Sequence, residues 1–336
     1  MVRDITSCRT PRLGGRLWRC ECGYETRVYK SCRNRHCPTC QGAESVRWVA
    51  GRIKDLLPIP YFHVVFTIPT QLHAWFRRCP RVAYAQILPA AAETLVAVCR
   101  SNLGATPGVI CVLHTWTQTL LFHPHVHCIV TGGGLSKDGL RWIASRPRFL
   151  VPVRRLSPVF RAKLLERVAR CTSSGRAPKT PKRWSVYCKP PMAGPEQVVR
   201  YLGRYTHRIA ISDRRILKLT DHDVTFSFRN RRAGNRRDHQ KLPIQTFIAR
   251  FLLHVVPRGF VRIRYYGLLS NGHKARRLAH ARNLLGAPAP PEPEPNWDCT
   301  DTACLTVGYA PRTCPSCGRN TLCFVAMIPA HPPRPP

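Results

Sequence analysis

Two histidines one residue apart offer half of a metal site. His125 and His127 flank Val126 within the run LFHPHVHCIVTGGG, residues 121 to 134. Because successive side chains of a β-strand point to opposite faces, both imidazoles would emerge on the same face of a strand. Neutral imidazoles are common metal ligands, so the pair suits a divalent cation. The competing interpretation is a pair of histidines on the solvated face of a half-buried strand.

Two tyrosines four residues apart offer a pair of nucleophiles. Proline and glutamate near the start of residues 194 to 205 are typical of a helix N-terminus, and Tyr201 and Tyr205 would then share one helix face. A tyrosine hydroxyl, with a pKa of ~10, attacks poorly until a metal and nearby cations ease its deprotonation. Attack on a phosphodiester would leave a covalent phosphotyrosine and a free DNA hydroxyl, and a second tyrosine permits a second strand transfer. The alternative is two tyrosines packed on a core.

A predicted hairpin must position the histidines. Residues 109 to 121 form a strand candidate that leads into the histidine strand, and His114 would lie roughly across from Val126. His114 is therefore a candidate third ligand, with Gln118 and Gln197 as competitors. A core or edge histidine without a ligand role is equally compatible with the pattern.

The hydrophobic periodicity predicts the remaining elements. Strands are expected over 61–68, 183–189 and 260–266 and a hairpin over 209–228; helices over 43–57, 81–102, 242–256 and 275–285; and a basic loop over 229–241. The glycines at 132–134 allow either the close approach of another backbone or an ordinary loop.

The charge of the chain points to a polyanionic partner. Its 336 residues hold 54 Lys and Arg against 17 Asp and Glu, a formal net charge of +37. Such an excess predicts binding to nucleic acid, whereas 44% hydrophobic residues indicate folded domains. A zinc hydrolase of small substrates fits this charge poorly, and no acidic general base accompanies the histidines. The candidate DNA contacts are Arg33, Arg35, Arg200, Arg204, Arg208, Arg231, Arg232, Arg236 and Arg237.

No apolar run approaches the ~20 residues of a membrane span. The N-terminus, MVRDITSCRT, lacks the apolar core of a signal peptide. We therefore expect a cytoplasmic protein that has no membrane partner.

Most of the 17 cysteines gather near the two ends of the chain, as expected for structural zinc in a reducing compartment. The predicted N-terminal ligands are Cys20, Cys22, Cys37 and Cys40, with Cys8, Cys32 and His36 as possible additional ligands. The predicted ligands of a second zinc are Cys299, Cys304, Cys314 and Cys317.

These features divide the chain into five parts. They are a zinc-binding domain (1–45), a catalytic domain (46–230), a basic extension (231–286), a proline-rich linker (287–296) and a second Cys-rich knuckle module (297–328).

Four motifs in this order resemble a known family. They are SCRNRHCPTC (31–40), HTWTQT followed by HPHVH (114–127), GPEQVVRYLGRYTHR (194–208) and YGLLSNG (266–272). Together they resemble the two-tyrosine rolling-circle insertion-sequence transposases, the IS-ninety-one family, within the HUH (histidine-hydrophobe-histidine) endonucleases. The resemblance extends over roughly residues 8 to 285.

The resemblance implies an α+β fold with a central antiparallel sheet flanked by helices, as in HUH endonucleases, and a zinc-binding domain at the N-terminus. The small Cys-rich zinc module at the C-terminus is expected from its cysteines alone. The resemblance also implies Tyr201 and Tyr205 as nucleophiles, Mg²⁺ or Mn²⁺ on His125 and His127, and cleavage of single-stranded transposon ends. A plasmid or phage replication initiator or relaxase would use the same chemistry. A catalytically inactive, zinc-containing DNA-binding protein is the alternative from another class.

Overall fold

The computed structural model describes residues 1–40, 45, 48–49, 51–53, 55–191, 197, 203, 209–230, 233–289 and 313–331. Its chain divides into two compact units. The larger comprises Gly51–Leu202 and Arg215–Pro291, and the smaller comprises Met1–Ala50, Gly203–Arg214 and Glu292–Pro336. The helix predicted over 43–57 lies only partly within the described residues.

A six-stranded antiparallel sheet forms the centre of the larger unit. Its strand order is β11-β4-β5-β3-β7, and β6 pairs with β5. The strands are β3 (Tyr61–Thr67), β4 (Ala105–Trp116), β5 (Phe122–Ser136), β6 (Trp142–Ala144), β7 (Val186–Lys189) and β11 (Ile263–Gly267). This sheet and the helices around it confirm the expected α+β fold.

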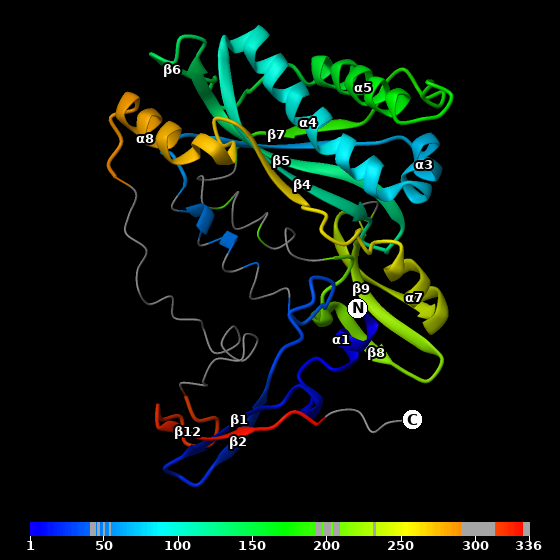
Figure 1. Cartoon of the computed structure of the whole chain (residues 1–336), viewed down its shortest axis with the longest axis vertical. Coiled ribbons are helices and arrows are strands. Elements are labelled where there is room, and N and C mark those ends of the chain that lie inside the picture. Colours follow the sequence, from blue (N-terminus) through cyan, green and yellow to red (C-terminus); the bar gives the residue numbers. More distant parts are fainter. Residues whose placement is uncertain are drawn as a thin grey trace. The chain divides into compact units, whose positions relative to one another are not determined.

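Helices cover one face of this sheet. They are α3 (His73–Arg78), α4 (Pro80–Leu103) and α5 (Val153–Arg170), which lie together along one side of the strands in Figure 1. Phe66 of β3, Cys111 of β4 and Cys128 of β5 all belong to the buried cluster beneath these helices. Alternate residues of the same strands therefore point to the opposite face, and these include both predicted metal-binding histidines.

Helix α4 is long and apolar enough, by length and composition alone, to cross a membrane. Gln86, Glu93 and Thr94 interrupt the apolar residues of this helix, so it contains no unbroken apolar run of ~20 residues. Ile87, Leu88 and Leu95 of this helix are fully buried in the core. Packing against the sheet accounts for its apolar character.

The turn between β4 and β5 is held by a buried histidine. The Nε2 of His254 lies 3.1 Å from the carbonyl oxygen of Leu120, and its Nδ1 lies 3.2 Å from the hydroxyl of Thr115. Burial lowers the pKa of His254 to about 4, so the ring is neutral at pH 7. Its two hydrogen bonds fix the turn that sets the register of the histidine hairpin.

Residues 132 to 134, for which the sequence left open an ordinary loop or the close approach of another backbone, are part of a strand. β5 continues through these glycines to Ser136, and β6 pairs with them. Gly133 has φ +137°, and a Cβ there would lie 2.6 Å from the carbonyl oxygen of Ile143. Glycine is a weak strand former, but at this position any side chain would clash with the backbone of β6.

A smaller sheet, β10-β9-β8, follows in the chain. It consists of β8 (Ile216–Leu219), β9 (Asp223–Asn230) and β10 (Arg236–Pro243), and the next helices are α7 (Ile244–Leu252) and α8 (Lys274–Leu284). Residues 236 to 241 were predicted to be part of a basic loop, but they belong to β10. Pairing with β9 stabilises this strand although its sequence is polar. The predicted domain boundary at residue 230 falls between two strands of this hairpin.

The smaller unit is built around the sheet β12-β1-β2. Its elements are α1 (Val2–Thr6), β1 (Gly15–Cys20), β2 (Glu25–Tyr29) and β12 (Leu322–Ile328). Figure 1 shows the red C-terminal strand beside the blue N-terminal strands. The sequence predicted two separate zinc modules, one at each end of the chain. Instead, β12 pairs antiparallel with β1, from Gly15↔Ile328 to Cys20↔Leu322.

Candidate metal centres

Three imidazoles meet on the face of the large sheet opposite the helices. Strand register brings them together, because His114 of β4 lies directly across from His125 of β5, and His127 is the next residue on the same face. The predicted hairpin had placed His114 across from Val126, one residue away. One ring nitrogen from each histidine lies within 4.8 Å of the other two.

The ring geometry suits convergence on one cation. The centroid of His114 lies 4.4 Å from that of His127 and 5.4 Å from that of His125, and the rings are steeply inclined to one another. His114 is only 3% exposed and stacks on Trp116 with 4.4 Å between centroids. Three nearby imidazoles of fixed orientation match the ligand chemistry of a divalent metal site.

Neither competitor of His114 lies on a strand of the large sheet. Gln118 lies in the turn between β4 and β5, where its backbone carbonyl oxygen accepts a hydrogen bond from Arg215. Gln197 is exposed and helical. His114 is the candidate that the strand register pairs with His125.

Hydrogen bonds at Nδ1 favour the tautomers that a metal site requires. The Nδ1 of His125 lies 2.6 Å from the carbonyl oxygen of His123, an arrangement in which Nδ1–H donates and Nε2 carries the lone pair. The Nδ1 of His127 lies 2.8 Å from the Nε2 of His63. A metal-binding histidine commonly donates its second ring N–H to such a partner.

His63 is a site residue that sequence reasoning missed. It lies on β3, is 5% exposed, and stacks almost parallel to His127 with 5.0 Å between centroids. Burial, together with the nearby ammonium of Lys189, lowers the pKa of His63 to about 4 and leaves its ring neutral. Alternation along the strand places His63 on the face opposite Phe62 and Val64, but its position beside His127 follows only from the pairing of β3 with β5.

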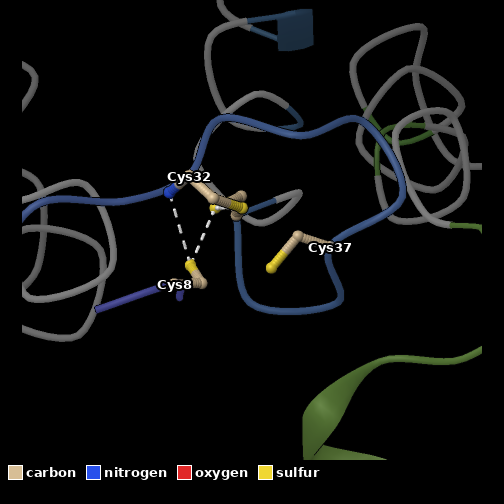
Figure 2. A group of neighbouring side chains, drawn as sticks. Cys8, Cys32 and Cys37 are labelled. Atoms are coloured by element: carbon tan, nitrogen blue, oxygen red, sulfur yellow. Dashed lines mark hydrogen bonds between the residues drawn. The ribbon is translucent and has the colours of Figure 1, made fainter. Parts of the chain in front are cut away.

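Four thiols near the N-terminus form a compact group: Cys8, Cys32, Cys37 and Cys40, whose sulfurs all lie within 4.8 Å of one another. Figure 2 shows the side chains of Cys8, Cys32 and Cys37 pointing toward one another. Cys40 Sγ lies 3.4 Å from Cys8 Sγ and 3.6 Å from Cys32 Sγ. Zinc–sulfur bonds of ~2.3 Å in a tetrahedron place sulfurs about 3.8 Å apart, so the group fits zinc.

The structure groups the cysteines differently from the predicted sets. Cys20 and Cys22, expected to bind with Cys37 and Cys40, instead lie with the C-terminal thiols of Cys314 and Cys317. Knuckle spacing identifies which thiols form pairs, but the long-range pairing of β12 with β1 decides which pairs meet. Two expected ligands of the C-terminal zinc, Cys299 and Cys304, lie outside the described residues.

His36 is not a member of the N-terminal thiol group. Its Nδ1 lies 3.2 Å from the side-chain oxygen of Asn34, whose same oxygen accepts a hydrogen bond from the His36 backbone N–H. This buried histidine thus supports the loop that carries Cys37.

The described residues include four of the arginines predicted to contact DNA. Arg33, Arg35, Arg236 and Arg237 have exposed side chains. Arg33 also lines a pocket in the smaller unit with Arg16, Lys30 and Tyr29. The two predicted nucleophiles and several arginines lie outside the described residues: Tyr201, Tyr205, Arg200, Arg204, Arg208, Arg231 and Arg232.

Comparison with known proteins gives consistent results. Residues 108–277 match a family model described as "Putative transposase", and residues 1–68 match a "Transposase zinc-binding domain". The chain is 41% identical to "Putative transposase y4qJ" of Sinorhizobium fredii (strain NBRC 101917 / NGR234), over 98% of this chain and 89% of the relative.

A second relative is more distant. The "Transposase for insertion sequence element IS801" of Pseudomonas savastanoi pv. phaseolicola is 26% identical, over 97% of this chain and 83% of that protein. No solved structure matches the chain. These matches confirm the resemblance that the four sequence motifs carry.

Proposed function

Because this chain belongs to the insertion-sequence transposases of the IS-ninety-one type, we propose that it cuts single-stranded DNA at the ends of its element through a phosphotyrosine intermediate. Strand transfer would then proceed by a rolling-circle-like mechanism. The observation that carries the proposal is the set of three imidazoles, His114, His125 and His127, which the strand register assembles on one sheet face. Membership of the family makes the protein a DNA-cleaving and strand-transferring enzyme.

The three imidazoles would hold Mg²⁺ or Mn²⁺. When bound, such a cation polarises the non-bridging oxygens of a phosphodiester as a Lewis acid. Imidazole suits transition metals better than Mg²⁺, so Mn²⁺ should support activity well in vitro. The role of the protein is to keep His125 and His127 in their ligating tautomers, through the carbonyl of His123 and the ring of His63.

Tyr201 and Tyr205 are the proposed nucleophiles. The phenol oxygen forms a bond to phosphorus, its proton passes to solvent or a nearby base, and the bond from phosphorus to the DNA oxygen breaks. That oxygen takes up a proton and becomes the free hydroxyl. The phosphotyrosine conserves the bond energy for religation, so no external energy source is required.

The substrate of the proposed reaction is DNA in the bacterial cytoplasm. A net charge of +37 supports strong attraction to phosphates. Exposed Arg33 and Arg35 beside the N-terminal thiol group, and exposed Arg236 and Arg237 on β10, would contact the backbone. Tyr29 in the pocket lined by Arg33 adds a ring on which an unpaired base can stack.

A covalent-adduct assay tests the proposed function. The full chain is incubated with Mn²⁺ and a labelled single-stranded oligonucleotide from the end of the insertion element. We expect a protein–DNA adduct that survives denaturation and does not form when EDTA is present from the start or when the oligonucleotide is first annealed to its complement. Tight binding without any adduct, for every end sequence, would contradict cleavage and favour a protein that only occupies DNA.

We expect His63→Ala to weaken Mn²⁺ binding about 10- to 100-fold, because His127 loses the partner that orients its ring. His63→Gln should retain most of the affinity, since its side-chain oxygen can accept the same hydrogen bond. Mn²⁺ affinity is measured by titration calorimetry and folding by thermal unfolding. His239→Ala, at an exposed position on β10, is the matched control. Unchanged Mn²⁺ affinity in a folded His63→Ala protein would remove His63 from the site.

A further inference from the structure

A second four-thiol group joins the two ends of the chain. Cys20 and Cys22 lie at the turn after β1, and Cys314 and Cys317 lie in the turn before β12. Cys20 Sγ is 3.6 Å from Cys317 Sγ, a residue 297 positions later. Cys22 Sγ is 3.7 Å from Cys314 Sγ, 292 positions later. Each end of the chain supplies two of the four sulfurs in this group.

The local backbone presents these sulfurs in tight turns. At the N-terminal turn, Gly23 has φ +87° and its N–H donates to the carbonyl of Cys20. At the C-terminal turn, Gly318 has φ +71° and its N–H donates to the carbonyl of Cys314. Positive φ at both turns favours glycine, so each turn is shaped to carry its thiol pair.

The pairing of β12 with β1 brings the two turns together. Cys20 is in register with Leu322, and Trp18 contacts Phe324 edge to face with 5.8 Å between centroids. The hydroxyl of Thr321 lies 2.9 Å from Cys20 Sγ, where it can donate to a thiolate. A hydrogen bond to the sulfur from outside the thiol group is typical of structural metal sites.

The sulfur separations fit a metal better than a disulfide. A disulfide bond is ~2.05 Å long, and cytosolic thiols are kept reduced. The separations of 3.6 and 3.7 Å approach the value of about 3.8 Å expected for the edge of a zinc–thiolate tetrahedron. Cys314 and Cys317 also lie outside both ranges matched by the family models, 1–68 and 108–277.

We propose that Cys20, Cys22, Cys314 and Cys317 bind one structural Zn²⁺ that clasps the C-terminal strand to the N-terminal sheet. The ion closes the chain into a loop and completes the smaller unit with residues from both ends. This clasp is independent of DNA cleavage, and it adds a site to the one formed by Cys8, Cys32, Cys37 and Cys40.

Zinc content of the full chain tests the site. We expect the Cys314→Ser, Cys317→Ser double variant, purified beside the wild type in a phosphine reductant, to contain one zinc ion fewer per chain by mass spectrometry. The reciprocal Cys20→Ser, Cys22→Ser variant should lose the same single ion. Cys171→Ser removes an exposed thiol outside the group and should lose none. Equal zinc content in the wild type and both double variants would overturn the proposal.

Cleavage of the linker tests the clasp with all cysteines intact. A specific protease site is inserted into the proline-rich stretch 287–295, and the cut protein is passed over a gel-filtration column. We expect the C-terminal fragment to co-elute with the rest of the chain, and a zinc chelator to reduce co-elution at least tenfold. Dissociation of the fragment while zinc is present, or co-elution that a chelator does not change, would show that zinc does not clasp the ends.

Discussion

The Tyr201→Phe, Tyr205→Phe double variant is expected to form no covalent DNA adduct, a loss on the order of 10³-fold or more. Phenylalanine retains the aromatic ring but has no oxygen that can bond to phosphorus. Binding of single-stranded DNA should therefore be retained, because rings and cations supply it. The measurement is the fraction of labelled oligonucleotide that migrates with the denatured protein, compared with binding of the same oligonucleotide under native conditions.

The matched control for the tyrosine pair is Tyr187→Phe. Tyr187 lies on β7 and is 54% exposed, so its loss should not change adduct formation. An adduct that persists in the double variant at wild-type yield would show that another side chain is the nucleophile. In that case the motif at residues 194 to 208 would serve DNA binding alone.

His114→Ala is expected to reduce adduct formation at least about 100-fold while leaving DNA binding intact. The change removes the imidazole that lies across from His125, so the cation loses one of three ligands. Because His114 is buried and stacked on Trp116, truncation also leaves a cavity, and thermal unfolding must accompany the assay. Mn²⁺ affinity, measured without DNA, should fall in parallel with adduct yield.

Gln118→Ala is the paired variant for His114→Ala. Gln118 lies in the turn rather than on β4, and we expect its side chain to be dispensable for the adduct. Near-normal cleavage by His114→Ala would transfer the third ligand role to Gln118 or Gln197. The two variants together therefore assign this ligand position whichever residue fills it.

The histidine hairpin was predictable because its signals are local. Alternation along β5 places His125 and His127 on one face, and the preceding β-branched run forms the partner strand. His63 was not predictable from its own surroundings. A single histidine in the buried run YFHVVFT has no ligand spacing, and its role follows only from the pairing of β3 with β5.

The cysteine grouping illustrates the limit of spacing arguments. Cys37 and Cys40 were identified as ligands from a two-residue gap, which fixes the shape of one turn. The partners of Cys20 and Cys22 depend instead on contacts across nearly the whole chain. Two strands that pair from opposite ends of a chain leave no local pattern in the sequence. The sequence therefore predicted two separate zinc modules, whereas the structure has one sheet.

The position of β12 also affects the order in which the protein is completed during synthesis. A ribosome adds ~5–20 residues per second, so about 15 to 60 s pass between the synthesis of Cys22 and that of Cys314. Throughout that interval β1 presents an unpaired edge, and the thiols of its turn lack their proposed partners. A nascent chain that stops before Leu322 lacks β12 and would keep this edge of β1 unpaired. The N-terminal sheet is therefore completed only after the residues of β12 have been synthesised.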